Sequence, residues 1–286
     1  MLEPLLPAEA IRVFFDGTLG EPQLDHPECV AVAADGSVWC GGERGQIFRI
    51  EGDGSAMEQV ASTGGFCLGL AFAPDGDLYV CDLKHAAVLR LAAGSNRPKV
   101  FSDGFRVPNY PAFAGDGTLY VSDSHGFHDP GPGIYRVDPD GASELWYDEP
   151  VDFANGLALS PDGRYLYVVE TFGSAVFRVP INEDGSAGAR EDVARFPGVL
   201  PDGIAFAADG SLFVACYEPS MVLRVDPDGG VGCLVRDPEA HALCHPTNAS
   251  FRGSTLLLSN LGRWHVSAVE LDVEGLPLPH AQGPAA

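Results

Sequence analysis

Four oxygen-bearing side chains recur at one repeated position of this sequence, and together they could hold a hard metal ion. Five of the Asp-Gly pairs in the sequence each follow a short apolar segment: Asp35-Gly36, Asp75-Gly76, Asp116-Gly117, Asp162-Gly163 and Asp209-Gly210. The residue seven positions before the aspartate is polar in four of these five copies. These residues are Glu28, Asn109, Asn155 and Asp202, whereas the other copy has Leu68. If the copies form a closed radial array, equivalent positions converge on its axis. Two carboxylates and two amides would then meet, and a divalent cation would relieve the repulsion between the carboxylates.

The ligand types favour calcium. Carboxylate, amide and water oxygens suit Ca²⁺ best, at roughly 2.3–2.6 Å, and suit Mg²⁺ or Mn²⁺ less well. Zn²⁺ would be expected to recruit histidine or cysteine, and neither occupies the repeated position. In a degenerate sixth copy, Thr247 or Asn248 could face the axis. We therefore expect one divalent metal ion, Ca²⁺ first, with Mg²⁺, Mn²⁺, Zn²⁺ or Fe²⁺ as alternatives.

Short β-strands are the elements that must position these residues. The five Asp-Gly pairs of this register are 40, 41, 46 and 47 residues apart in succession. Asp-Gly between two apolar runs is a strong hairpin signal, because glycine supplies the positive φ that such turns require. Periods of about 40–50 residues with several short strands each are typical of propeller blades. With the degenerate copy NASFRGSTLLLSN, the array has six repeats.

The two ends of the array complement each other. The sixth copy ends near residues 267–271 without a fourth strand, while residues 11–15 form an extra apolar segment ahead of the first copy. Pairing the two would close the ring and remove the edge strands of an open array. The sequence therefore predicts an all-β, six-bladed β-propeller as a single domain over residues 1–286. Residues 11–15 are the closing strand that completes the last blade, and residues 272–286 are a tail.

Composition argues against several classes of partner. The chain has 17 basic and 40 acidic residues and a formal charge of −23, which repels nucleic-acid phosphates and anionic membrane surfaces. Seven cysteines without a C-x-x-C pair indicate neither a disulfide framework nor a zinc cluster, and Cys40, Cys81 and Cys216 are expected to be buried thiols. The N-terminus does not read as a signal peptide, and no apolar run approaches a membrane span. We expect a cytoplasmic protein that is a monomer or a weak homo-oligomer.

Several short motifs carry a family resemblance: His26-Pro27-Glu28, Pro108-Asn109, Asn155-Gly156 followed by S-P-D-G, Pro201-Asp202-Gly203 and Pro246-Thr247-Asn248. With them, all six repeats resemble the gluconolactonase and senescence-marker-protein (regucalcin) family of six-bladed metal-dependent lactonases. The resemblance implies that Glu28, Asn155 and Asp202 hold the metal. It implies that Asn109 lies beside the metal and contacts it or the substrate, and that Asp202 is the general base.

Other residues are candidates for substrate binding. The family often reads P-N-D in the third blade, whereas this chain has Pro108-Asn109-Tyr110. Some members have an arginine before that asparagine, and the nearest one here is Arg106. The loop 124–133 contains two histidines that could contact substrate or relay a proton, because histidine titrates near neutral pH; the alternative is a surface loop with solvated histidines. The candidates are therefore Asn109, Arg106, Tyr110, His125 and His128.

The function expected from these residues is hydrolysis. A divalent metal at the mouth of the central channel would act as a Lewis acid and help to open a small, sugar-type lactone. An esterase or phosphotriesterase using the same metal site is an alternative, favoured by aromatic residues near this mouth. A non-catalytic, ligand-binding propeller is another, because fold alone does not decide function. A metal-free, strictosidine-synthase-like enzyme is less favoured. A bound metal would distinguish the metal-dependent enzyme from the ligand-binding propeller, since a propeller that only binds a ligand has no use for two carboxylates at the channel mouth.

Overall fold

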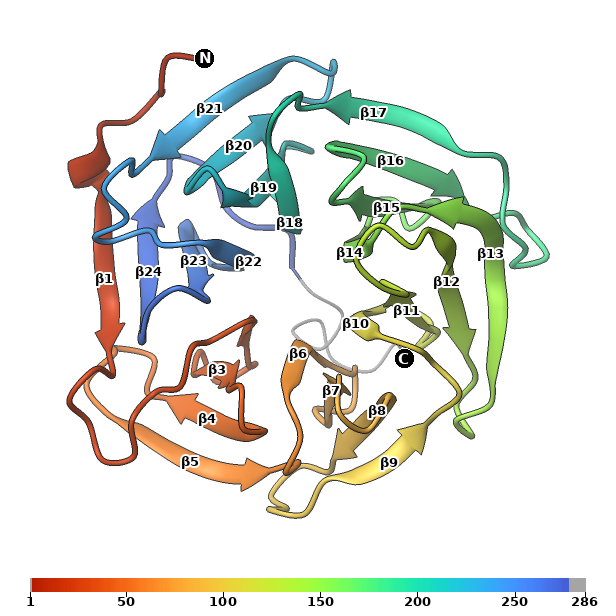
Figure 1. Ribbon diagram of the computed structural model, residues 1–286, viewed down its shortest axis with the longest axis horizontal. Helices are drawn as coiled ribbons and strands as arrows, with labels where there is room; N and C mark the ends of the chain where they lie inside the picture. The colour runs from red at the N-terminus through yellow and green to blue at the C-terminus, as the bar shows by residue number, and fades with distance from the viewer. Residues whose placement is uncertain (1, 278–286) are drawn as a thin grey trace.

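The structure is a computed structural model that describes residues 2–277. These residues form 24 β-strands and one three-residue 3₁₀-helix, η1 (Ala8–Ala10). The strands make six four-stranded antiparallel sheets, arranged around a common centre like the blades of a propeller (Figure 1). The predicted all-β, six-bladed β-propeller is confirmed. No helix in this part of the chain is long and apolar enough to cross a membrane.

In the first five blades the strands follow one another in chain order from the centre outward (Figure 1). Blades one to three consist of β2 (Val30–Val32), β3 (Val38–Gly41), β4 (Gln46–Ile50) and β5 (Met57–Ser62); β6 (Cys67–Phe72), β7 (Leu78–Asp82), β8 (Ala87–Leu91) and β9 (Lys99–Ser102); and β10 (Pro108–Phe113), β11 (Leu119–Asp123), β12 (Gly131–Val137) and β13 (Ser143–Val151). Blades four and five consist of β14 (Ala154–Leu159), β15 (Tyr165–Glu170), β16 (Ala175–Pro180) and β17 (Glu191–Arg195); and β18 (Leu200–Phe206), β19 (Leu212–Glu218), β20 (Met221–Val225) and β21 (Val231–Arg236).

The sixth blade takes its outer strand from the beginning of the chain. It consists of β22 (Pro246–Arg252), β23 (Thr255–Asn260), β24 (His265–Glu270) and β1 (Ile11–Asp16). Strand β1 pairs antiparallel with β24, and Figure 1 shows the two side by side although they lie at opposite ends of the sequence. The predicted closing strand is therefore confirmed, and it extends one residue further, to Asp16.

The Asp-Gly pairs form the hairpins between the first two strands of five blades. Their glycines all have φ between +67° and +88°, a region that other residues adopt only with strain. The aspartate has its own role, because its carboxylate accepts a backbone N–H two residues later. Asp35 accepts from Ser37 at 2.9 Å, and Asp116 accepts from Thr118 at 2.9 Å. Since each of these first strands ends in such a turn, the turns lie at one mouth of the channel and the strand starts lie at the other.

A cavity of about 370 Å³ lies at the Asp-Gly mouth. Apolar residues of the inner strands line it, among them Leu70, Phe113 and Phe206, together with Leu276 from the end of the described chain. The backbone N–H of Leu276 donates to the carbonyl of Phe206 at 2.9 Å. The described part of the predicted tail, residues 272–286, therefore packs against this mouth, and its last nine residues lie outside the described range.

The hydrophobic core lies between the blades. Buried side chains from neighbouring sheets form apolar clusters, so each blade is packed on both of its faces. All seven cysteines are free and buried, which confirms the prediction for Cys40, Cys81 and Cys216. Burial raises the pKa of the Cys40 thiol to about 12, so this thiol stays protonated at neutral pH.

Candidate metal centre

The polar residues at the repeated position lie where the inner strands are irregular. The ladder between β10 and β11 skips Asn109 and the residue after it. In the same way β14 skips Asn155, β18 skips Asp202 and β6 skips Leu68, while Glu28 precedes the start of β2. A bulge of this kind bends a strand and re-aims a side chain. The repeated position is therefore one at which the backbone is free to turn a side chain toward the axis.

A glycine follows Asn155 and Asp202 for a steric reason. A Cβ atom on Gly156 would lie 2.6 Å from the backbone oxygen of Asp202, and one on Gly203 would lie 2.6 Å from that of Thr247. Both distances are too short for any side chain. The inner strands of blades four, five and six therefore approach backbone to backbone at this level, which brings Asn155, Asp202 and Thr247 close to one another.

Two hydroxyl groups fix the orientation of the asparagine amides. Asn109 Nδ2 donates to Ser124 Oγ at 2.9 Å, and Asn155 Nδ2 donates to Thr171 Oγ1 at 3.2 Å. Each hydroxyl donates in turn to a backbone carbonyl of the next blade, at 2.6 and 2.8 Å. Because a hydroxyl has one proton, it can only accept from the asparagine. The Oδ1 atom of each amide is thereby left for another partner.

The carboxylates of Glu28 and Asp202 are withdrawn from solvent and interact with each other. Asp202 is a buried residue, and the Oε2 atom of Glu28 is buried. Burial is the largest cause that raises the pKa of both groups. The negative charge of Asp202 raises the pKa of Glu28 further, and a hydrogen bond from Asn155 acts in the opposite direction on the pKa of Asp202. Two like charges buried together are costly unless a proton or a cation neutralises them.

Two buried oxygen atoms, one in blade one and one in blade six, have unused acceptor capacity. Within the described part of the chain, Glu28 Oε2 and Asn248 Oδ1 have no hydrogen-bond partner. A buried acceptor without a partner costs free energy and points to a ligand. Carboxylate and amide oxygens are the ligands that hard divalent cations prefer. The donor set of Glu28, Asn155 and Asp202 therefore fits a divalent cation, and Asn109 holds the equivalent position in blade three.

The last repeat contributes two adjacent residues in different ways. The ladder between β22 and β23 passes from Pro246 to Asn248 and skips Thr247, so Thr247 holds the position equivalent to Asp202. Its hydroxyl donates to the backbone carbonyl of Glu28 at 2.6 Å. Thr247 thus links blade six to blade one, while Asn248 supplies the buried oxygen without a partner.

Three of the candidate substrate-binding residues lie in loops at the mouth where the inner strands begin. Arg106 Nη1 lies 3.4 Å from His125 Nδ1 and makes a 2.7 Å ion pair with Asp129. The His128 ring packs at a tilt against Phe172, with ring centroids 4.3 Å apart. The structure thus brings Arg106, His125 and His128 to the same mouth as Asn109.

Tyr110 lies inside the channel and not in a loop at its mouth. It lines the channel cavity, and its phenol forms a hydrogen bond with the side chain of Asn248. Its ring packs over Gly69, where a Cβ would meet Tyr110 Cδ2 at 2.7 Å. Burial raises the pKa of its phenol. A role for Tyr110 in substrate binding stays a prediction.

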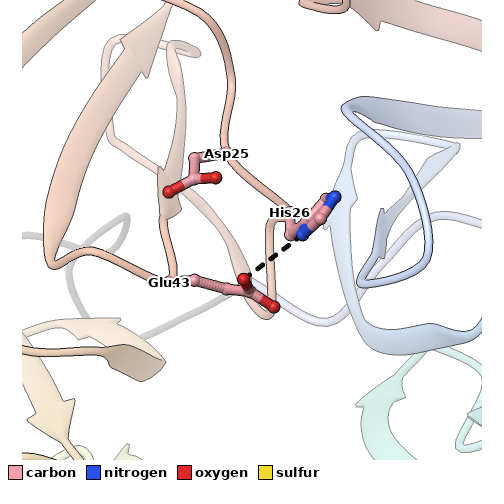
Figure 2. Close-up of side chains that lie close together, drawn as sticks. All are labelled: Asp25, His26 and Glu43. Atoms are coloured by element: carbon pink, nitrogen blue, oxygen red, sulfur yellow. Dashed lines mark ion pairs between the residues drawn. The ribbon is translucent and has the colours of Figure 1, made fainter.

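A second group of ligand-type side chains, Asp25, His26 and Glu43, lies in blade one (Figure 2). Their ligand atoms are within 4.8 Å of one another. Asp25 Oδ2, however, already accepts from Arg44 Nε at 2.9 Å and from Gln46 Nε2 at 3.0 Å, and His26 Nδ1 lies 3.3 Å from Glu43 Oε2. These contacts tie the segment before β2 to the loop between β3 and β4. The group is therefore held by contacts of its own, while the negative charge of Glu43 also raises the pKa of Glu28.

Sequence reasoning missed the hydroxyl residues that hold the asparagines. Ser124 and Thr171 each directly follow the acidic residue that ends the second strand of their blade. They stand 15 residues after Asn109 and 16 residues after Asn155. A comparison of the second strands of the repeats, made in the same way as for the first strands, would have shown this recurring hydroxyl.

Comparison with known proteins identifies the family. Residues 27–257 match the family described as SMP-30/gluconolactonase/LRE-like region. A 6-deoxy-6-sulfogluconolactonase from Pseudomonas putida is 34% identical over 143 residues, which is 48% of this chain and 47% of that protein. The match thus spans about half the length of this relative. Protein strictosidine synthase-like 6 from Arabidopsis thaliana is 26% identical over 318 residues of alignment, which covers 91% of this chain and 82% of that protein.

Solved structures share the architecture. A calcium-binding protein, regucalcin, from Agrobacterium tumefaciens superposes with a TM-score of 0.75 at 18% identity, covering 96% of this chain and 97% of that one. At this identity the likeness concerns the fold. The family match includes the candidate ligands from Glu28 to Asn248 and confirms the resemblance found in the motifs. The chain therefore belongs to the SMP-30/gluconolactonase/LRE-like family.

Proposed function

We propose that this protein is a hydrolase that opens a small lactone at a divalent-cation site formed by Glu28, Asn155 and Asp202. One observation carries the proposal: Glu28 Oε2 is buried without a partner among the described residues, close to a second buried carboxylate. A bound cation would neutralise the two buried carboxylates and supply the missing partner of Glu28 Oε2. The reaction class is supported by the relative from Pseudomonas putida, which is named a sulfogluconolactonase.

The residues of the site have different proposed roles. A bound divalent cation would polarise the carbonyl of the lactone as a Lewis acid. Glu28, Asn155 and Asp202 supply its oxygen ligands, and Asn109 contacts the ion or orients the substrate. Asp202 is the proposed general base, because a carboxylate beside the reacting carbon can accept the proton of the attacking water.

Ca²⁺ is the proposed ion, since the side chains of the site offer only oxygen. Mg²⁺, Mn²⁺, Zn²⁺ and Fe²⁺ are the alternatives, and the regucalcin of similar fold is described as calcium-binding. Sugar-type lactones are the first substrates to test, because the relative named above acts on one by its name. We propose the cytoplasm as the location, where seven free thiols stay reduced. A monomer or weak homo-oligomer remains our proposal.

Metal analysis combined with a lactone assay tests the proposal. We expect one equivalent of a divalent ion, loss of lactone hydrolysis with chelator, and recovery when Ca²⁺ is restored. Glu28→Gln and Asp202→Asn keep the size of the side chain but remove a charge. Each should lose the bound ion and lower kcat/KM by roughly 100-fold or more. Glu58→Gln, at an exposed position of the outer strand β5, is the matched control and should keep both.

Other outcomes lead to the other functions. Full hydrolysis in the presence of chelator would point to a metal-free enzyme. A protein that holds no ion and keeps its melting temperature on chelation would be a ligand-binding propeller. If the protein binds a metal and hydrolyses phosphotriesters or other activated esters but not lactones, the proposed metal site is correct and the proposed substrate is wrong.

A further inference from the structure

Three phenylalanines and a histidine form an aromatic cluster at the mouth of the metal centre. The cluster consists of Phe127, Phe153, Phe172 and His128. The Phe127 ring stacks on Phe153 at 5.4 Å and lies 5.9 Å from Phe172, and Phe153 meets Phe172 edge-on at 5.1 Å. Phe127 is nevertheless 79% exposed. A large aromatic side chain held in place but open to solvent is typical of a binding surface.

Short connections fix the cluster to the residues of the metal centre. Phe153 precedes Asn155 by two residues, and Phe172 directly follows Thr171, which holds the Asn155 amide. Phe127 follows Ser124, which holds the Asn109 amide, by three residues. A molecule bound at Asn109 and Asn155 would therefore have the aromatic cluster as its neighbour.

The backbone at the cluster is constrained. Phe153 has φ +66° and His128 has φ +51°, a left-handed conformation that is unfavourable for a bulky residue. Hydrogen bonds hold the turn, since the backbone N–H of Thr171 donates to the carbonyl of Phe153 at 3.2 Å. The Phe153 ring is thus directed toward Phe127 and Phe172 at a cost in backbone strain.

The charges around the cluster disfavour an anionic group. Arg106 is already paired with Asp129 at 2.7 Å. Asp152, next to Phe153, has a buried carboxylate oxygen without a hydrogen-bond partner in residues 2–277. Phenylalanine rings offer no hydrogen bond to a hydroxyl group. The surface is therefore suited to a neutral, apolar group.

We propose that the aromatic cluster binds an apolar substituent of the substrate, so that the preferred substrates are neutral lactones carrying an alkyl or aryl group rather than polyhydroxylated ones. The inference rests on the proposed lactonase function and replaces the sugar-type lactones named there with a less polar substrate class. Phe127 is its specificity-determining residue.

A series of γ-butyrolactones with zero, two, four and six carbons at the γ position tests the inference. For the Ca²⁺-loaded wild type we expect kcat/KM to rise with chain length, by up to about fourfold for each methylene group that is buried. The rise should come from KM. Phe127→Ala should reduce the preference for the six-carbon over the unsubstituted lactone by about tenfold, and Phe127→Leu by less. Val100→Ala, an exposed apolar position in β9, is the control and should keep the wild-type preference.

Binding without turnover separates this inference from the proposed function. The matching γ-alkyl lactams can be titrated calorimetrically into wild type and Phe127→Ala in the presence of chelator. Affinity that rises with chain length in wild type only would support the cluster even if no lactone were hydrolysed. Lactone hydrolysis without chain-length preference, or equal losses for substituted and unsubstituted lactones in Phe127→Ala, would overturn the inference and leave the proposed function intact.

Discussion

The hydroxyl behind each asparagine decides what that asparagine can do. An amide group can rotate to present either its nitrogen or its oxygen, and the two choices have opposite consequences for a cation. Thr171 Oγ1 gives its proton to a backbone carbonyl and must therefore accept from Asn155 Nδ2. The amide oxygen is then available without further reorganisation. Loss of a residue that orients a metal ligand typically lowers metal affinity by about 10- to 100-fold.

Replacing the Thr171 hydroxyl tests whether it orients the Asn155 amide. Thr171→Val keeps the shape of the side chain and removes the acceptor, so the Asn155 amide can rotate. We expect a roughly 10- to 100-fold loss of Ca²⁺ affinity, measured by calorimetric titration of the chelated protein. Thr171→Ser restores the hydroxyl and should restore the affinity. Unchanged affinity in Thr171→Val would show that another contact orients Asn155.

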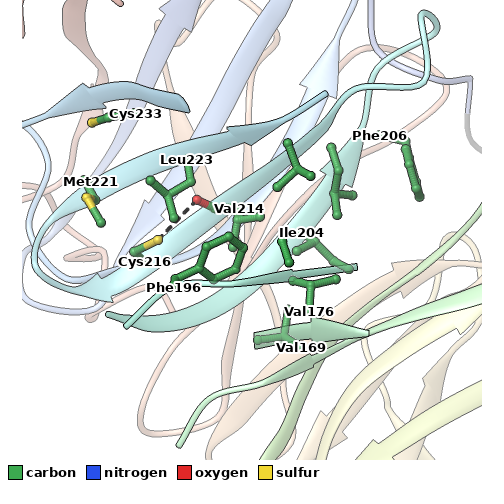
Figure 3. Close-up of a cluster of buried hydrophobic side chains, with 13 residues drawn as sticks. Val169, Val176, Phe196, Ile204, Phe206, Val214, Cys216, Met221, Leu223 and Cys233 are labelled. Atoms are coloured by element: carbon green, nitrogen blue, oxygen red, sulfur yellow. Dashed lines mark hydrogen bonds between the residues drawn. The ribbon is translucent and has the colours of Figure 1, made fainter. Parts of the chain in front are cut away.

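At the scale of the elements, the inner strands combine close packing with local irregularity. Hydrophobic side chains fill the space between blades four and five, among them Val169 and Val176 on one side and Ile204 on the other (Figure 3). Near the mouth where the strands start, the inner strands of neighbouring blades are in backbone contact, which is possible because glycine has no side chain. The packing fixes the distance between the blades, and the bulge next to each glycine re-aims the site residue.

A methyl group at this contact should disturb both the packing and the site. In Gly203→Ala the new Cβ would lie 2.6 Å from the Thr247 carbonyl oxygen. We expect the free energy of unfolding to fall by about 1–3 kcal/mol and Ca²⁺ affinity to weaken as Asp202 is displaced. Urea denaturation and metal titration measure the two effects.

Gly115→Ala is the matched control for this substitution. A Cβ at Gly115 meets no atom within 4 Å, and this glycine is not among those with positive φ. We expect its stability and Ca²⁺ affinity to match the wild type. If Gly203→Ala were as stable as Gly115→Ala, the close approach of the strands would not be a constraint on the sequence.

At the scale of the whole molecule, one pairing joins the two ends of the described chain. Strands β1 and β24 belong to the same sheet, and their ladder runs from the pair Ile11 and Val269 to the pair Asp16 and His265. Without β1, the edge of β24 would be open and would be a template for aggregation. Closure also holds Glu28 of blade one next to Thr247 of blade six.

Removal of the closing strand tests the single-domain prediction for residues 1–286. A chain that lacks residues 2–16 should melt at a lower temperature and self-associate, because the β24 edge is exposed. The intact chain should unfold in one cooperative calorimetric transition, since all six blades share interblade packing. Scanning calorimetry and gel filtration provide the measurements. Two well-separated transitions in the intact chain, or a truncated chain as stable as the intact one, would contradict the prediction.

The sequence alone was sufficient for the fold and for the position of the candidate ligands. The Asp-Gly turn recurs because glycine tolerates its φ without strain and because the aspartate caps the turn. The Asp-Gly turn therefore marks the end of each inner strand. The residue seven positions before its aspartate lies near the start of that strand, at the opposite mouth of the channel. The sequence also predicted the closing strand, because the last repeat lacks a fourth strand and the chain begins with an extra one. An unpaired strand edge is unfavourable, so the two were expected to pair.

The tertiary structure decided which side chains surround the candidate ligands. Whether Thr247 or Asn248 faces the axis depends on one skipped pair in a ladder. Tyr110 follows a site residue, yet its side chain lines the channel cavity and forms a hydrogen bond with Asn248. The aromatic cluster unites three loops from two blades. Periodicity determines where strands begin and end because it depends on local turns and alternation, whereas contacts between loops of different blades depend on side-chain packing that no local pattern encodes.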